Sequence, residues 1–116
     1  MKKVIFITFD FGLKGDYENF YKWLDENNAV ERGYCTAYIK EYVTKQKFTS
    51  DREFVLHIKN EIKEKVKIGS NDRIYMIWNG IEDVTKIRSG FLFGSEKQAP
   101  WTGFSKNTVD DLKLDF

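Results

Sequence analysis

The sequence predicts an α+β domain in which two helices cover one face of an antiparallel sheet. Up to residue 80, strand-like apolar runs alternate with segments whose apolar residues recur every three or four positions. A long stretch over residues 32–44 alternates between two kinds of side chain, as a strand does. The chain has 116 residues, of which 41% are hydrophobic and 16% aromatic, so we expect a single domain with a substantial core.

The charge balance and the cysteine content narrow the function classes. The charge of nineteen Lys and Arg residues is nearly balanced by that of eighteen Asp and Glu residues, so the protein has no large net charge that would attract polyanions. A polyanion site would have to be a local patch. Cys35 is the only cysteine, which excludes an internal disulfide and suggests a reducing compartment. No apolar run has the length of a membrane span or a signal segment, so we expect a soluble cytoplasmic protein.

The first strand and the first helix are predicted over residues 4–28. Val4–Phe9 is a nearly continuous apolar run, typical of a central strand that is buried on both faces, and it ends at Asp10. After a glycine-containing loop, Asp16 is the predicted N-cap of a helix that ends near Asn27. The apolar stripe of this helix comprises Tyr17, Phe20, Tyr21 and Leu24.

The second helix and the next strand follow residue 49. Ser50 and Glu53 fit a capping box, and Gly69 is the predicted residue just after the helix. The stripe of this helix comprises Phe54, Val55, Ile58, Ile62 and Val66. After a polar turn, Arg73–Trp78 has the composition of a strand.

The alternating stretch Arg32–Thr44 divides its side chains between two faces. One face is small or aliphatic and is predicted to join the core: Cys35, Ala37, Ile39 and Val43. The other face carries a row of tyrosines and a lysine: Tyr34, Tyr38, Lys40 and Tyr42. Because tyrosine combines an apolar ring with a polar tip, this row is predicted to be either a dimer interface or a platform on which bases stack.

The order of these segments predicts a ferredoxin-like βαββαβ sandwich, provided that the long second strand bends into a hairpin. Residues 1–80 form the predicted core. Residues 81–116 form a C-terminal extension that packs on the core or across a dimer. We expect an extra strand within 84–93, a loop or short strand at 100–104, and a docked tail over 107–116.

The layout resembles the small dimeric subunit of the CRISPR adaptation machinery and the toxin ribonuclease virulence-associated protein D. The matching segments are Ile5–Asp10, Gly33–Val43 and Asn71–Ile77, within the first two thirds of the chain. The resemblance implies a homodimer whose sheets face each other and place Asp10 near its twin, where the two carboxylates hold a divalent metal. Two departures are that Lys22 stands where the family usually has an arginine in the first helix, and that residues 90–104 have no counterpart.

Asp10 is the candidate catalytic residue and metal ligand. A carboxylate at the end of a central strand suits Mg²⁺ or Mn²⁺, which would activate water for metal-dependent cleavage by an endoribonuclease or other nuclease. The alternative is that Asp10 only ends its strand or accepts hydrogen bonds from the following loop. His57 is the only histidine, so no histidine-based metal cluster exists within one chain, and we expect it to be partly packed or at the solvent edge.

Two functions remain open for the aromatic face. The first is a nucleic-acid-associated protein of the CRISPR-adaptation or toxin type. The second is a non-catalytic interaction or regulatory module, with the face and the loop around Trp101 binding a protein partner. The match of Arg32–Tyr34 to the RNA-recognition motif fails, because it lies in the second predicted strand and Thr36 and Ile39 occupy aromatic positions. A dimer is favoured over nucleic acid, because the protein lacks a basic rim.

Overall fold

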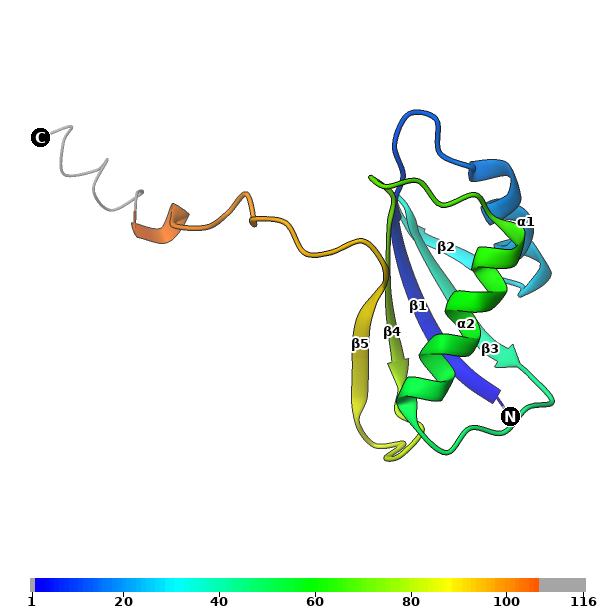
Figure 1. The fold of residues 1–116 in the computed structure, drawn as a ribbon. Helices are drawn as coiled ribbons and strands as arrows, with labels where there is room; N and C mark the ends of the chain where they lie inside the picture. The colour runs from blue at the N-terminus through cyan, green and yellow to red at the C-terminus, as the bar shows by residue number, and fades with distance from the viewer. Residues whose placement is uncertain (1, 107–116) are drawn as a thin grey trace, which may run out of the picture.

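The computed structural model describes residues 2–106 of the chain, which form a sheet of five strands covered by two helices (Figure 1). The elements, in chain order, are β1 (Lys2–Asp10), α1 (Tyr17–Glu26), β2 (Val30–Gly33), β3 (Thr36–Val43), α2 (Asp51–Lys65), β4 (Arg73–Asn79) and β5 (Ile87–Phe93). The spatial order is β2-β3-β1-β4-β5, and every neighbouring pair is antiparallel. The predicted α+β class with an antiparallel sheet is confirmed.

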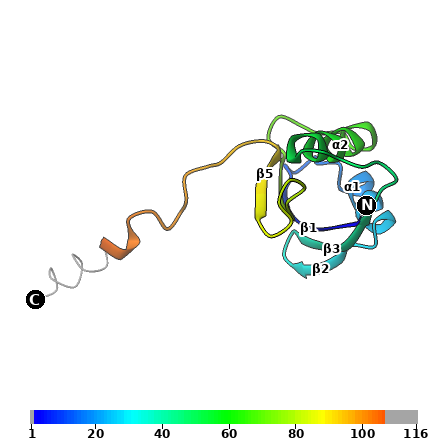
Figure 2. The same cartoon turned by 90° about the horizontal axis from the view of Figure 1, so that it is seen from below.

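Both helices lie on the same side of the sheet (Figure 2). Asp16 caps α1 by accepting a hydrogen bond from the Asn19 amide, and Ser50 caps α2 through the Glu53 amide at 3.1 Å, as predicted. The prediction that Gly69 directly follows α2 is wrong. The helix ends at Lys65, since Val66 has extended backbone geometry. No helix within residues 2–106 is long and apolar enough to cross a membrane.

Strand β1 lies at the centre of the sheet, but it is buried on one face only. Its odd-numbered residues pack under the helices, where Ile5 and Ile7 are fully buried, whereas its even-numbered residues alternate to the other side. Phe6 is 40% exposed there. The prediction that this strand is buried on both faces is therefore wrong, because a two-layer fold has helices on only one side of the sheet.

The alternating stretch contains a turn and a β-bulge. Cys35 has a left-handed φ of 54° and takes part in the turn between β2 and β3. Near the end of β3 the pairing with β1 is irregular. Lys3 of β1 pairs with Tyr42, and Ile5 of β1 pairs with Ile39, so two residues of β3 lie opposite Val4 alone. This bulge shifts the alternation by one residue and turns Tyr42 towards the helices. The prediction that one continuous row of tyrosines covers one face is therefore wrong.

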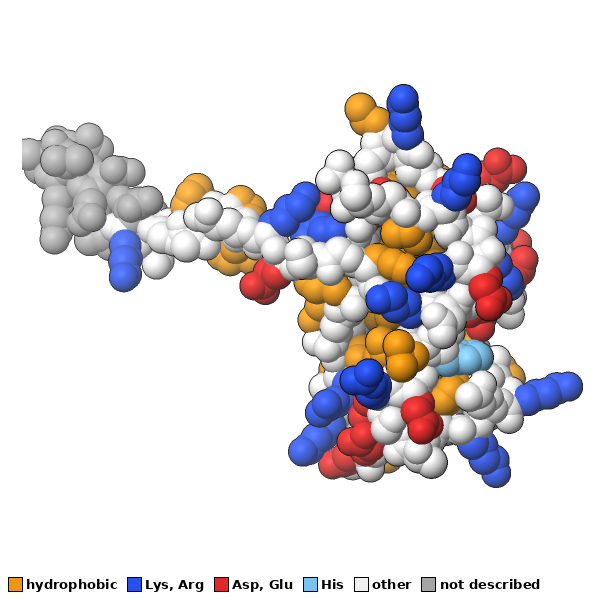
Figure 3. Space-filling view, in the orientation of Figure 1, with side chains coloured by type: hydrophobic (Ala, Val, Ile, Leu, Met, Phe, Trp, Pro, Cys, Tyr) orange, Lys and Arg blue, Asp and Glu red, His pale blue; other side chains and the backbone are white. Residues whose placement is uncertain are grey.

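Residues beyond Asn79 contribute a fifth strand and a projecting segment. Strand β5 pairs with β4 at the sheet edge, which agrees with the extra strand expected within 84–93. Residues 94–106, here called the C-terminal arm, then lead away from the sheet and end in a helical turn (Figure 1). Figure 3 shows hydrophobic side chains on this arm and charges of both signs on the helix side of the body. The predicted tail over 107–116 lies outside the described residues.

Candidate functional site

The sheet presents an uncovered face opposite the helices, called the open sheet face below. Its members follow from the strand alternation and the pairing register: Val4, Phe6, Thr8, Asp10, Thr36, Tyr38, Tyr75, Ile77 and Phe91. Each of these side chains is half-buried or exposed. Contiguous exposed apolar surface of this kind usually marks a binding site.

Two pairs of aromatic rings stand on the open sheet face. Phe6 and Tyr38 occupy directly paired positions of β1 and β3, with ring centroids 4.6 Å apart and ring planes 21° from parallel. The Arg32 guanidinium lies 5.8 Å from the centre of the Tyr38 ring, within cation–π range. Tyr75 and Phe91 meet edge to face at 4.9 Å, and the Tyr75 hydroxyl donates to Ser89 Oγ at 2.6 Å.

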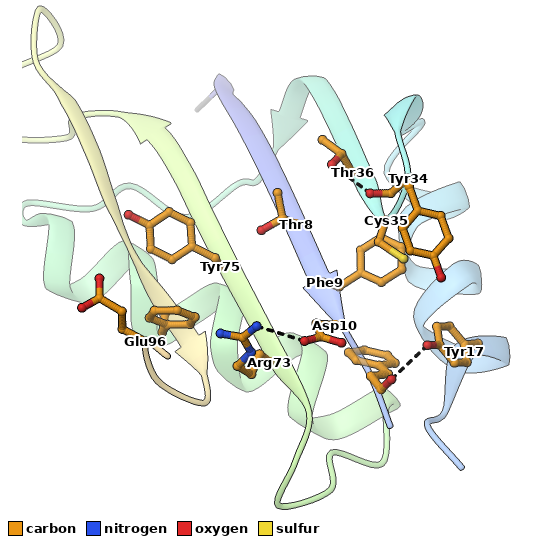
Figure 4. A pocket seen from close by; sticks show the side chains of 12 residues that line it. Thr8, Phe9, Asp10, Tyr17, Tyr34, Cys35, Thr36, Arg73, Tyr75 and Glu96 are labelled. Atoms are coloured by element: carbon orange, nitrogen blue, oxygen red, sulfur yellow. Dashed lines mark hydrogen bonds and ion pairs between the residues drawn. The ribbon is translucent and has the colours of Figure 1, made fainter. Parts of the chain in front are cut away.

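A cleft of about 610 Å³ opens where β1 ends (Figure 4). We call it the Asp10 cleft. Its lining includes the hydroxyl-bearing Thr8 and Thr36, Cys35 of the hairpin turn and Glu96 of the arm. Figure 4 shows Tyr17 and Tyr34 to one side of β1 and Tyr75 to the other, with Asp10 between them. A cleft of this size with aromatic walls and a few polar groups is typical of a small-ligand site.

Asp10 and Arg73 form an ion pair in this cleft. Arg73 Nη2 donates to Asp10 Oδ2 at 3.0 Å, and Arg73 Nη1 donates to the Ser95 carbonyl at the start of the arm at 3.3 Å. The Asp10 side chain is 59% exposed and that of Arg73 is 26% exposed. Arg73 Nε is buried and has no hydrogen-bond acceptor in the described part of the chain. The pair therefore presents an exposed carboxylate beside a guanidinium whose Nη1 and Nη2 each keep one N–H after these contacts.

The side chains around Asp10 show which ligands a metal ion would find there. Residues 2–106 contain no cluster of three His, Cys, Asp or Glu side chains that could hold a metal ion. Asp10 contributes one carboxylate, one oxygen of which already accepts from Arg73. Because Mg²⁺ completes six-fold coordination with waters and phosphate oxygens, a metal here would depend on ligands from nucleic acid or a second copy.

The structure separates the tyrosines that the sequence pattern grouped. Tyr38 lies on the open sheet face, whereas Tyr34 sits in the hairpin turn, is 96% exposed and lines the Asp10 cleft. Lys40 is exposed at the bulge, and Trp101 is 73% exposed on the arm, so neither joins the Asp10 cleft. Tyr42 is only 2% exposed and belongs to the core under the helices.

Tyr42 belongs to a polar cluster on the helix side. Its hydroxyl donates to Glu61 Oε2 at 2.8 Å and lies 2.9 Å from His57 Nε2. Trp23 Nε1 donates to the other oxygen of Glu61 at 2.9 Å. Burial, together with the hydrogen bond to the Glu61 carboxylate, raises the pKa of the Tyr42 phenol. His57 is partly packed at the solvent edge, as predicted.

Sequence reasoning missed Phe6, Arg73, Tyr75 and Phe91 as parts of this surface. A signal for Phe6 was present, because Phe6, Thr8 and Asp10 alternate with the core residues of β1. Arg73 joins Asp10 only through the pairing of β1 with β4, across 63 positions of sequence. No local pattern indicates such a contact.

No protein-family model, curated protein or solved structure matches this chain.

Proposed function

We propose that this protein binds single-stranded nucleic acid on its open sheet face. The observation that carries the proposal is the Phe6–Tyr38 ring pair, which is accessible and lies on adjacent strands at the middle of the sheet. Exposed aromatic rings on a sheet stack unpaired bases, because every base has a π-face. Arg32 beside Tyr38 adds a cation next to the ring on which a base would stack.

The chain order supports a ferredoxin-like βαββαβ assignment with β5 added at one edge. In this assignment β1, α1, β2, β3, α2 and β4 form the core motif, and the neighbours β2-β3-β1-β4 form its sheet. Tyr38 then lies on the third strand, because Val30–Gly33 is a strand of its own. The Arg32–Tyr34 match to the RNA-recognition motif still fails, because Arg32 and Gly33 lie in β2, and the proposal uses Phe6 of β1 and Tyr38 of β3 instead. Sheets that bind single-stranded RNA carry their stacking aromatics in this way.

The charge of the face limits the expected affinity. Two of its nearby cations are already paired: Arg73 with Asp10 at 3.0 Å and Lys2 with Glu41 at 3.9 Å. Among residues 2–106, few cations near this face remain without an ion pair, so we expect stacking to contribute most of the binding and the salt dependence to be shallow. The same surface suits a second copy of the chain, and a homodimer is the competing outcome of the test below.

Titration of the purified protein against labelled single- and double-stranded RNA and DNA tests this proposal. Phe6→Ala and Tyr38→Ala each remove one ring and should weaken single-strand binding by about 5- to 150-fold, the worth of one base stack. Leu56→Ala is the control, because Leu56 is 44% exposed on α2, away from the open sheet face. It should bind as the unmodified protein does.

Two results would overturn the proposal: no binding at low salt, or binding that Phe6→Ala leaves unchanged. A homodimer that Phe6→Asp dissociates, measured by light scattering, would then assign the face to a second copy.

The same samples with Mg²⁺ or Mn²⁺, analysed for cleavage products, test the nuclease function that the resemblance implies. Cleavage that requires the metal and is lost in Asp10→Ala would support the nuclease function and place its site at Asp10.

A further inference from the structure

The Asp10–Arg73 pair presents a fixed pattern of hydrogen-bonding groups to the Asp10 cleft. The two carboxylate oxygens of Asp10 are acceptors, and the guanidinium of Arg73 supplies donors beside them. Asp10 Oδ1 has no hydrogen-bond partner within residues 2–106, and Oδ2 has only Arg73. A ligand that lies along this pair therefore meets three groups in order, namely the two acceptor oxygens of Asp10 and then an N–H donor of Arg73.

We infer that the Asp10 cleft takes one base of a bound strand and that this base is guanine. The Watson–Crick edge of guanine offers the N2 amine, the N1–H and the O6 acceptor, in the order donor, donor, acceptor. This order complements the edge of the Asp10–Arg73 pair. Adenine places one donor beside the N1 acceptor, and cytosine places one donor beside the N3 and O2 acceptors, so in both bases an acceptor would face the carboxylate. Uracil has a single donor between two acceptors. The inference rests on the proposed binding of single strands.

The position of the cleft suits a base that follows one stacked on Phe6. Phe6, Thr8 and Asp10 project from alternate positions of β1 on the same face. Four residues of strand span about 13 Å, so Phe6 and Asp10 can contact neighbouring parts of one strand. Tyr34 and Tyr17 on one side and Tyr75 on the other provide apolar surface for the base (Figure 4).

The arginine is held in position for this role. Strand β4 places Arg73 opposite Asp10 in the sheet register, and the Ser95 carbonyl accepts from Nη1 at 3.3 Å. Gly94 lies against the arginine stem, since a Cβ at this residue would come within 2.6 Å of Arg73 Cγ. Because Nη1 and Nη2 each carry two protons, each keeps one N–H after these contacts, and O6 of the base can accept it.

The test compares uridine 12-mers that carry one central guanine, inosine or adenine. Guanine should bind at least about fivefold tighter than adenine, the lower range for a bidentate base contact. Inosine should fall between them, because it keeps N1–H and O6 but lacks the N2 amine. Dissociation constants from fluorescence anisotropy at one fixed salt concentration give these ratios.

Asp10→Asn replaces one acceptor oxygen by an amide donor and should abolish the guanine preference. Asparagine pairs with adenine through one donor and one acceptor, so the ratio should shift towards adenine. Glu64→Gln is the charge-matched control, since Glu64 is exposed on α2, and its guanine-to-adenine ratio should equal that of the unmodified protein.

The outcomes separate this inference from the proposal on which it rests. Equal affinity for all three oligomers, lost in Phe6→Ala, would overturn the guanine site and leave single-strand binding standing. If no oligomer binds, single-strand binding is overturned, and guanosine monophosphate is then titrated directly by NMR. Amide shifts at Asp10 and Thr36 with guanosine but not adenosine monophosphate would keep the guanine site, and their absence would overturn it.

Discussion

Phe6 and Tyr38 stand side by side on the two adjacent strands β1 and β3, with ring centroids 4.6 Å apart. Both rings belong to the face opposite the helices, and Phe6 remains 40% exposed in the single chain. Exposed neighbouring aromatic rings forgo apolar burial, a cost to stability that a binding surface explains. The two rings are therefore available to the binding proposed for this face, whereas Tyr42, the next tyrosine in β3, is buried in the core.

Tyr42→Phe should lower the free energy of unfolding by about 1–3 kcal/mol. It removes a hydroxyl that donates to Glu61 and contacts His57 in a nearly water-free position. Tyr38→Phe is the matched control, because the Tyr38 hydroxyl has no hydrogen-bond partner in the described chain, and its effect should stay within about 0.5 kcal/mol. Urea unfolding measures both changes. Equal effects of the two substitutions would contradict the assignment of Tyr42 to the core.

Asp51 should make the stability of the protein depend on pH in acid. Its carboxylate accepts from Trp78 Nε1 at 2.9 Å and from the Ile81 amide at 2.8 Å. Burial pushes the pKa of Asp51 up, but these hydrogen bonds and the nearby Arg88 guanidinium outweigh it, so the pKa lies below its usual value of 3.8. A depressed native pKa means that the unfolded chain takes up the proton first as the pH falls.

The stabilisation by ionised Asp51 should therefore be complete above about pH 4 and decline as the pH falls towards the native pKa. Asp51→Asn keeps an acceptor oxygen and removes the charge, so it should cost about 1 kcal/mol at pH 7. The difference from the unmodified protein should shrink between pH 4 and pH 2, as measured by urea unfolding. A difference that is constant over this range would show that the charge of Asp51 contributes nothing.

Local features of this fold were predictable because they depend on neighbouring residues. The Asp16 and Ser50 caps and the β4 strand follow from spacing and residue type. The bulge opposite Val4 was not predictable, because it is a property of how two strands pair. Strand pairing also explains why only part of the candidate site was predictable. Asp10 contacts Arg73 only because β1 and β4 pair in this register, so the sequence indicated the carboxylate but not its partner.

Gly94→Ala should disturb the Asp10 cleft more than the core. Gly94 has a φ of 80°, and an added Cβ would lie 2.6 Å from Arg73 Cγ and 3.0 Å from the Asp72 carbonyl. The left-handed backbone costs a residue with a side chain about 1–2 kcal/mol, and Arg73 must move away from the added methyl group. We expect a loss of about that size in unfolding free energy, together with a smaller guanine-to-adenine ratio.

Gly90→Ala is the control for this substitution. It lies on the same strand-and-arm segment, and an added Cβ there meets no atom within 4 Å. Its unfolding free energy and base preference should match those of the unmodified protein. If Gly94→Ala also leaves the base preference unchanged, the position of Arg73 does not determine which base is bound.

Trp101 should report whether the C-terminal arm docks on a second copy. Trp23 and Trp78 are 0% and 5% exposed, whereas Trp101 is 73% exposed on the arm. In a monomer, acrylamide should quench one tryptophan strongly and leave the other two protected, and Trp101→Phe should remove the quenchable component. Because removal of an exposed side chain costs little, Trp101→Phe should change the unfolding free energy by less than about 0.5 kcal/mol.

If the arm packs across a dimer, one of the two placements that the sequence suggested, Trp101 should become protected from acrylamide as the protein concentration rises. Quenching that is independent of protein concentration would contradict packing across a dimer.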